Sequence, residues 1–301
     1  MLALLVALPI LGGLAFSLYV VLPRKLESEK ALAVDADKGW IDIVAWKNWV
    51  KEEVSITSSF GYRIKGTYLP LPGSQKTVIF YHGHSWSRYG SLKYVPLFRK
   101  FGFNSLIIDS RAHGASGGVT CTYGWKEKED GKACADWVIG KTGPGTLIGL
   151  HGESLGAVCA LLHASIDPRI AFVVADAAFS DLHEILLYRY KDSVRLPLFP
   201  VFYLAEFFLP LVAGGFSVGK VSPVSETHKI QAPVLFIHGA DDNYTPPYMS
   251  ERMYKEKIKT GKAELLLVPG ARHAKSLPTN PELYEKTVRK FLDSHLPETA
   301  R

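Results

Sequence analysis

TLIGLHGESLG, residues 146–156, joins a short apolar run to a G-x-S-x-G motif. Residues 146–150 predict a buried strand, and a helix is predicted from Leu155 onward. Within so sharp a strand-to-helix turn, the glycines two positions before and after the serine remove side chains that would collide. The hydroxyl of Ser154 would project above the sheet, at the positive end of the helix. The motif therefore predicts a nucleophilic serine at the edge of an α/β sheet.

Two polar residues follow later strands, in the order that a serine nucleophile of this kind needs. Asp242 comes after PVLFIH (233–238), and His273 comes after ELLLV (264–268). A serine hydroxyl needs a base near neutral pH, so His273 is expected to take its proton and Asp242 to orient the imidazole. Asp241 competes for the acid position, and the H-G-x-x-D spacing favours Asp242.

Acyl transfer also requires donors for the negative charge that develops on the carbonyl oxygen. The expected donors are the backbone N–H groups of Leu155, directly after the nucleophile, and His84, after the strand TVIFY (77–81). The pair His82 and His84 superficially suggests a metal site, but no acidic or histidine ligand follows at nearby spacing. No metal and no cofactor is expected.

The chain around the motif alternates strands with helices. Strands are predicted at 54–57, 63–68, 77–81, 104–109, 146–150, 171–175, 233–238 and 264–268. Helices are predicted at 91–101, 125–139, from 155, at 247–257 and at 281–292. Such alternation predicts an α/β fold with a mainly parallel sheet and helices on both faces.

One long segment between the strands at 171–175 and 233–238 interrupts the alternation. Its middle, RLPLFPVFYLAEFFLPLVAGGF (195–216), is apolar and aromatic and contains three prolines. We interpret it as part of a lid over the active site, spanning about 181–222; a second membrane span and a purely structural insertion are the alternatives. The predicted substrate-facing lid residues are Tyr188, Phe199, Phe202, Tyr203, Phe207 and Phe208.

Residues 2–22, LALLVALPILGGLAFSLYVVL, contain no charge and are long enough to cross a hydrocarbon core. We predict a single-pass transmembrane anchor at 1–23, a connector at 24–50 and a catalytic domain at 51–297. A cleaved signal peptide and a buried core helix are the alternatives. Arg24, Lys25 and Lys30 after the span favour a cytoplasmic catalytic domain.

Composition adds little about partners. The net charge is +6 and no long lysine or arginine run is present, so a nucleic-acid partner is not expected. The positive charge would help the domain lie near an anionic membrane, or only aid solubility. The three cysteines have no C-x-x-C spacing and predict neither a disulfide framework nor a zinc site. The oligomeric state is not predicted.

Taken together, five motifs resemble the α/β-hydrolase superfamily: HG near 82, D-x-R-x-H-G-x-S at 109–116, H-G-E-S-L-G at 151–156, H-G-x-x-D at 238–242 and the late His273. The chain is most similar to bacterial membrane-anchored hydrolases of the serine-aminopeptidase-like and monoacylglycerol-lipase-like group. The resemblance implies an eight-stranded sheet, a lid between the sixth and seventh strands, and a serine hydrolase. Ala112 departs from the glycine or basic residue that the family often has there.

The expected activity is carboxylic-ester hydrolysis through an acyl-enzyme. The aromatic lid favours an apolar acyl group, so the expected partners are a small-molecule acyl ester, with a lipid as one candidate, and the membrane through the N-terminal helix. Amide or peptide hydrolysis, acyl transfer and a non-catalytic scaffold are the alternatives, because this fold hosts many activities.

Overall fold

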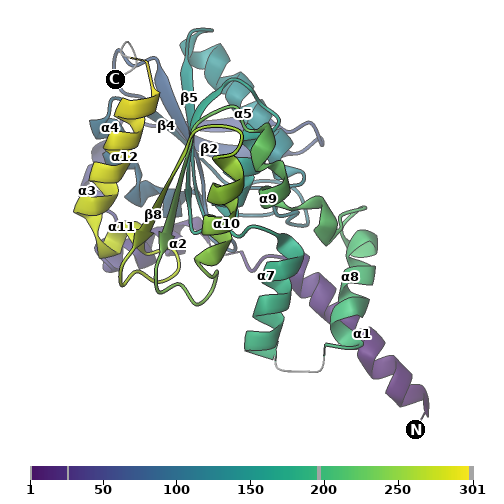
Figure 1. The fold of residues 1–301 in the computed structure, drawn as a ribbon. Helices are drawn as coiled ribbons and strands as arrows, with labels where there is room; N and C mark the ends of the chain where they lie inside the picture. Colours follow the sequence, from purple (N-terminus) through teal and green to yellow (C-terminus); the bar gives the residue numbers. More distant parts are fainter. Residues whose placement is uncertain (1, 26, 195–197, 298–301) are drawn as a thin grey trace.

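The computed structural model describes residues 2–25, 27–194 and 198–297, without the side chains of residues 2–6. One eight-stranded sheet forms its centre, in the order β1-β2-β4-β3-β5-β6-β7-β8 (Figure 1). β1 and β2 run antiparallel to their neighbours, and all other pairs are parallel. The predicted mostly parallel eight-stranded sheet is confirmed. The strands are β1 (Glu52–Thr57), β2 (Arg63–Leu69), β3 (Lys76–Tyr81), β4 (Asn104–Ile108), β5 (Leu147–Glu153), β6 (Ile170–Asp176), β7 (Val234–Gly239) and β8 (Ala263–Val268).

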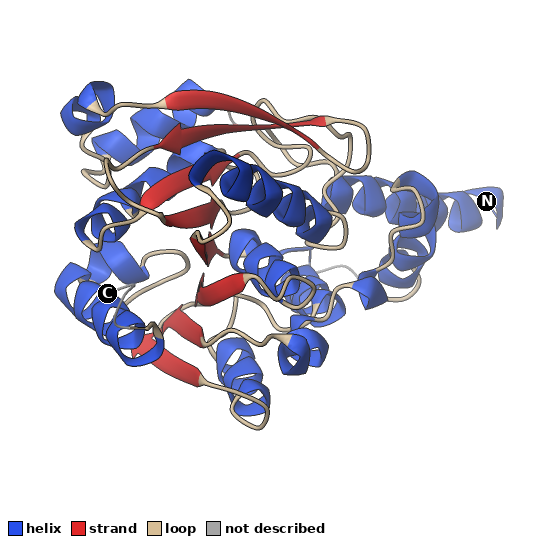
Figure 2. Cartoon of the chain, turned by 90° about the horizontal axis from the view of Figure 1, so that it is seen from above, coloured by secondary structure: helices blue, strands red, loops and turns tan. Residues whose placement is uncertain are grey.

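Helices cover both faces of the sheet, as Figure 2 shows from above. One apolar core lies beneath α5 (Glu127–Thr142), α6 (Leu155–Ala164) and α10 (Tyr248–Lys257). The other lies beneath α3 (Ile43–Asn48), α4 (Val95–Lys100) and α12 (Pro281–His295). The shorter elements are α2 (Ser28–Asp37), η1 (Arg88–Lys93) and α11 (Ser276–Thr279). Residues 77–81 of β3 are all buried, which explains why TVIFY is a continuous run rather than an alternating one.

The segment between β6 and β7, residues 177–233, is a mainly helical insertion. We call it the insertion. Its elements are α7 (Leu182–Arg189), η2 (Tyr190–Val194), α8 (Val201–Val212), η3 (Val218–Lys220), α9 (Pro223–Glu226) and η4 (Thr227–Lys229). Residues 195–197 at the start of the predicted apolar stretch lie outside the described residues.

The N-terminal segment forms α1 (Leu2–Val21), which lies beside α8 and projects from the domain (Figure 1). A Cβ atom on Gly13 would lie 2.5 Å from Cβ of Leu204, so the two helices approach at a glycine. At the other end, the carbonyls of Val20 and Val21 accept hydrogen bonds from the Tyr123 hydroxyl and the Cys121 N–H. The second half of α1 is therefore part of the folded domain.

This packing bears on the predicted transmembrane anchor. The first side chains of the predicted span, up to residue 6, lie outside the described part of the chain. Within the part that the structure describes, no helix combines the length and the apolarity that crossing a bilayer requires. The transmembrane prediction for residues 1–23 is not supported, because the apolar side chains near the end of α1 are used to pack against the protein.

Candidate active site

Ser154 lies between β5 and α6 with a backbone φ of +56°. Such a left-handed conformation is strained for a residue with a side chain and is held only by its surroundings. A Cβ atom on Gly152 would lie 2.1 Å from the Gly156 carbonyl oxygen, and one on Gly156 would lie 2.1 Å from the Tyr81 carbonyl oxygen. Both contacts are with backbone, so only glycine fits at either position. The structure thus has the sharp turn that the motif predicts.

The structure brings the three predicted partners together. Nε2 of His273 lies 2.9 Å from Oγ of Ser154, and Nδ1 of the same ring lies 2.7 Å from Oδ2 of Asp242. Asp242 and His273 follow the carboxyl ends of β7 and β8, the same edge of the sheet as Ser154. Asp241, the competing acid, is exposed, whereas Asp242 is 3% exposed.

Asp242 is surrounded by donors. Its Oδ1 accepts the N–H groups of Tyr244 and Thr245, each at 2.8 Å, and Nε2 of His238 lies 3.2 Å from its Oδ2. Burial raises the pKa of Asp242, but the hydrogen bonds from His238 and His273 outweigh burial and hold that pKa well below its usual value. The carboxylate is therefore charged at neutral pH, as the orienting acid of an imidazole base needs to be.

The two predicted oxyanion donors lie around Ser154. Leu155 is the first residue of α6, and His84 lies in the loop after β3. A Cβ atom on Gly83 in this loop would lie 3.8 Å from Cβ of Ser154, so the loop runs beside Ser154. Leu155 and His84 both line the cavity that contains Ser154 and His273.

This cavity has a volume of about 850 Å³. Its apolar wall comes from α1, α7 and the residues next to them: Phe16, Tyr19, Val20, Leu22, Phe179, Leu182, Ile185, Leu186 and Tyr190. None of the six aromatic residues predicted to face the substrate belongs to the described lining. Phe202 is buried against Phe16 and Tyr190, while Phe199, Tyr203 and Phe207 are exposed, Phe208 is half-buried, and the Tyr188 hydroxyl donates to the Asn243 carbonyl.

The wall residues of α1 were missed because the whole segment was interpreted as a membrane span. The glycine pair Gly12-Gly13 is the signal that could have placed it, since adjacent small residues allow another helix to approach closely. α7 supplies the rest of the apolar wall, so the insertion reaches the cavity through a different helix from the one its aromatic content suggested.

A charged cluster also lines the cavity. Nζ of Lys93 lies 2.5 Å from Oε2 of Glu153, the residue before Ser154, and the Tyr94 hydroxyl donates to the same oxygen at 2.6 Å. Asp35 from α2 also lines the cavity and accepts from Nε1 of Trp86. Asp176, at the end of β6, lies beneath this cluster; burial, reinforced by the Glu153 carboxylate, raises its pKa to about 6.

The turn after β4 is held together by hydrogen bonds to Asp109. Asp109 is fully buried, and its carboxylate accepts the backbone N–H of Ala115 and both the backbone and guanidinium N–H groups of Arg88. Arg88 was not predicted as its partner. Arg111 donates from Nε to the Thr120 carbonyl instead.

The only three-residue group of possible metal ligands in the described part of the chain is His84, His113 and Cys121. His82 is not part of it: its Nε2 accepts the Ser110 N–H at 3.0 Å, and its Nδ1 lies 2.7 Å from the Gly83 carbonyl oxygen.

Comparison with known proteins agrees with this architecture. A family model described as X-Pro dipeptidyl-peptidase (S15 family) matches residues 37–208. The uncharacterized protein YqkD of Bacillus subtilis (strain 168) is 38% identical over 284 residues, covering 94% of this chain and 92% of that protein. The α/β hydrolase domain-containing protein WAV2 of Arabidopsis thaliana is 24% identical, covering 98% of this chain and 88% of that protein. Among solved structures, the Pyrococcus furiosus esterase Pf2001 matches with a TM-score of 0.69 and 28% identity, covering 83% of this chain and 92% of that chain.

Proposed function

Because the chain belongs to the X-Pro dipeptidyl-peptidase (S15) family of the α/β-hydrolase superfamily, we propose that it hydrolyses carboxylic esters through an acyl-enzyme on Ser154. Serine hydrolase chemistry follows from the family, and the choice of esters is our proposal. The observation that carries the proposal is that hydrogen bonds connect Ser154 to His273 and His273 to Asp242. Ser154 and His273 line a largely apolar cavity.

The proposed steps use the geometry directly. Nε2 of His273 accepts the Ser154 proton while Oγ attacks the ester carbonyl carbon. The N–H groups of Leu155 and His84 stabilise the oxyanion, and His273 then donates its proton to the leaving alkoxide. Water, deprotonated by the same imidazole, attacks the acyl-enzyme. His273 then returns that proton to Oγ of Ser154 as the bond from Oγ to the acyl carbon breaks and the acid is released. Asp242 orients the ring and stabilises its charged form throughout.

The proposed substrate is an ester with an apolar acyl group, and a lipid is one candidate. Leu182, Ile185 and Leu186 of α7 and Phe16 of α1 line the cavity and offer apolar surface for an acyl chain. The esterase activity in the name of the Pyrococcus furiosus relative supports the same class. We also propose that the insertion acts as a lid, with α7 rather than α8 against the substrate.

Amide or peptide hydrolysis is the second candidate. The specific observation in its favour is that the carboxylates of Asp35 and Glu153 line the cavity and could accept a substrate ammonium group. The peptidase name of the matched family points the same way. Against it, Glu153 is already paired with Lys93 and Asp35 with Lys38.

The deciding experiment compares substrates on the purified full-length chain. A series of nitrophenyl esters of increasing acyl length is assayed beside aminoacyl and X-Pro nitroanilides. Ester hydrolysis that rises with acyl length supports the proposal, and cleavage of the anilides alone overturns it. Transfer of the acyl group to an added alcohol, in preference to water, would identify an acyltransferase.

Labelling by a fluorophosphonate tests the nucleophile itself. Wild type is expected to label, and Ser154→Ala is expected not to. Ser165→Ala is a matched control, because Ser165 lies at the other end of α6 and should label as wild type does. Full labelling of Ser154→Ala would refute the assignment.

We further propose that α1 and α8 contact a lipid surface without spanning it. Leu8 and Leu11 on α1 and Phe207 and Leu211 on α8 are each at least 60% exposed, on adjacent helices that project from the domain (Figure 1). Arg24 and Lys25 follow α1 and are exposed, which suits anionic headgroups.

Co-sedimentation with anionic phosphatidylserine-containing vesicles tests the lipid contact. Phe207→Asp with Leu211→Asp is expected to reduce the bound fraction, whereas Val50→Asp, at an equally exposed apolar residue after α3, is not. Equal binding by all three proteins, or no binding by wild type, would contradict the proposal.

A further inference from the structure

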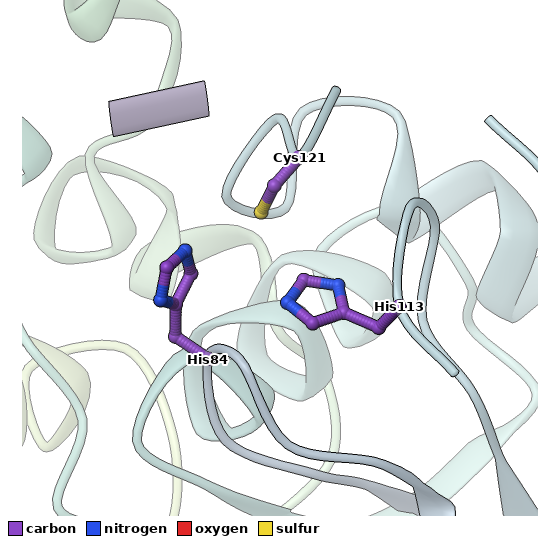
Figure 3. Close-up of side chains that lie close together, drawn as sticks. All are labelled: His84, His113 and Cys121. Carbon is purple, nitrogen blue, oxygen red and sulfur yellow. The ribbon is translucent and has the colours of Figure 1, made fainter. Parts of the chain in front are cut away.

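Three potential metal ligands from separate loops lie close together (Figure 3). His84 follows β3, His113 lies in the turn after β4, and Cys121 lies in the loop before α5. One ligand atom from each residue lies within 4.8 Å of the other two. His113 is 0% and Cys121 1% exposed, so the cluster is largely shielded from solvent.

His113 presents an unsatisfied nitrogen to this cluster. Its Nδ1 donates to the Arg111 carbonyl at 2.8 Å, which leaves the lone pair on Nε2. Nε2 is buried and has no hydrogen-bond partner in the described part of the chain. An unsatisfied buried polar atom costs about 1–3 kcal/mol of folding free energy. A ligand that binds this nitrogen would remove that cost. Donation from one ring nitrogen to a backbone carbonyl is also the arrangement that holds a metal-binding imidazole in place.

The other two side chains have partners that a metal bond could replace. Cys121 is a free thiol that hydrogen-bonds the Glu127 carboxylate, and its backbone is fixed by its own N–H, which donates to the Val21 carbonyl. The His84 ring stacks on Tyr123, with centroids 5.6 Å apart and planes 13° apart. Its Nε2 is 3.4 Å from the Tyr123 hydroxyl, a long contact that a stronger ligand bond could replace.

We propose that His84, His113 and Cys121 bind a zinc ion. Two imidazoles and one thiolate are ligands that Zn²⁺ prefers, and they leave one tetrahedral position for a water molecule. Zinc–nitrogen bonds of about 2.0–2.1 Å and a zinc–sulfur bond of about 2.3 Å place ligand atoms roughly 3.3–3.6 Å apart. Closing from the present separations requires movements of about 1 Å, within reach of side-chain rotation.

The binding step is balanced by one proton. The Cys121 thiol loses its proton to solvent as the zinc–sulfur bond forms. Both imidazoles are neutral and bind without net loss of a proton: His113 uses its Nε2 lone pair, and His84 uses the ring nitrogen that its tautomer leaves unprotonated. The site could not be found from sequence spacing because its ligands come from three loops that are joined only by the fold.

Cobalt absorption tests the site without relying on a Cys121 variant. Co²⁺ occupies tetrahedral zinc sites, and a bound thiolate gives it a near-ultraviolet charge-transfer band. In the Cys134→Ala/Cys159→Ala protein any such band has to come from Cys121, because no other cysteine remains. We expect this protein and wild type to show the band with one equivalent of Co²⁺ and to lose it when Zn²⁺ is added. Absence of the band from both refutes the proposal.

Competition with a chromophoric chelator then measures zinc affinity. Cys121→Ala is expected to weaken zinc binding at least about 100-fold, because losing a ligand costs more than losing a residue that only hydrogen-bonds to a ligand. Cys134→Ala is the matched control and should bind zinc as wild type does. Calorimetry in two buffers should show one proton released per zinc bound. Unchanged zinc affinity in a folded Cys121→Ala protein would overturn the assignment, and if that variant does not fold, the cobalt band decides.

Discussion

The ion pair between Lys93 and Glu153 is expected to be worth several kilocalories per mole to the fold. Its side chains are only 4% and 14% exposed, and the atoms are 2.5 Å apart. Lys93→Met would leave the Glu153 carboxylate with the Tyr94 hydroxyl as its remaining close donor. Removing one partner of a buried pair costs about 3–5 kcal/mol, because the other charge stays desolvated. The remaining donor and the partial exposure of Glu153 place the expected loss near the lower end, about 3 kcal/mol.

The double variant Lys93→Met/Glu153→Gln separates the pair from other effects. Because it removes both charges, its stability should return to within about 1 kcal/mol of wild type, so the two single losses should not add. Urea unfolding followed by tryptophan fluorescence measures all four proteins, and an unchanged m-value shows that the denatured state is comparable. Lys259→Met is the control: Lys259 and Glu256 are 2.7 Å apart but 63% and 43% exposed, so its effect should stay below about 1 kcal/mol. Single losses under about 1 kcal/mol, or additive ones, would refute the reasoning.

Three other substitutions test the site. Asp242→Asn should lower turnover about 10⁴-fold and also lower stability at neutral pH, because the depressed pKa of Asp242 means that its charged form stabilises the fold; steady-state kinetics showing less than a ten-fold loss would contradict its role. Asp176→Asn tests the raised pKa: the native carboxyl keeps its proton up to about pH 6 while the unfolded one ionises near pH 4, so wild type loses up to about 3 kcal/mol relative to the variant as the pH rises through that window. A stability difference that does not change between pH 4 and 7 would exclude this. Gly156→Ala should destabilise by about 1–3 kcal/mol or more and abolish fluorophosphonate labelling, since its Cβ would meet the Tyr81 carbonyl; normal labelling would show that the turn relaxes.

The sheet could be predicted because its strands are short apolar runs separated by polar turns. The ends of individual helices were predicted less accurately. The helix expected at 91–101 is divided into η1 and α4, and Pro96 explains the break because it has no N–H to continue the helix from the preceding turn. Asp242 and His273 could be placed because both follow strands whose carboxyl ends share one edge. The structure brings both to Ser154.

Features that depend on tertiary packing could not be predicted from the sequence. An uncharged apolar helix has the same composition whether it faces lipid or another helix, so α1 was placed in a membrane although it packs on α8. Aromatic content likewise drew attention to α8, but which helix of the insertion faces the cavity depends on how the insertion folds back. The pairing of Asp109 with Arg88 joins loops that are unrelated in sequence.

The wall that α1 gives to the cavity also sets an order of events during synthesis. α1 is translated well before α8, its main packing partner, and before the Tyr123 loop that binds its end. At typical elongation rates of about 5–20 residues per second, the helix waits on the order of ten to forty seconds for α8 to leave the ribosome. During that interval its apolar side chains have no intramolecular cover and are open to chaperones or to a lipid surface. The cavity is therefore completed late, when α1 packs against the later-made α8.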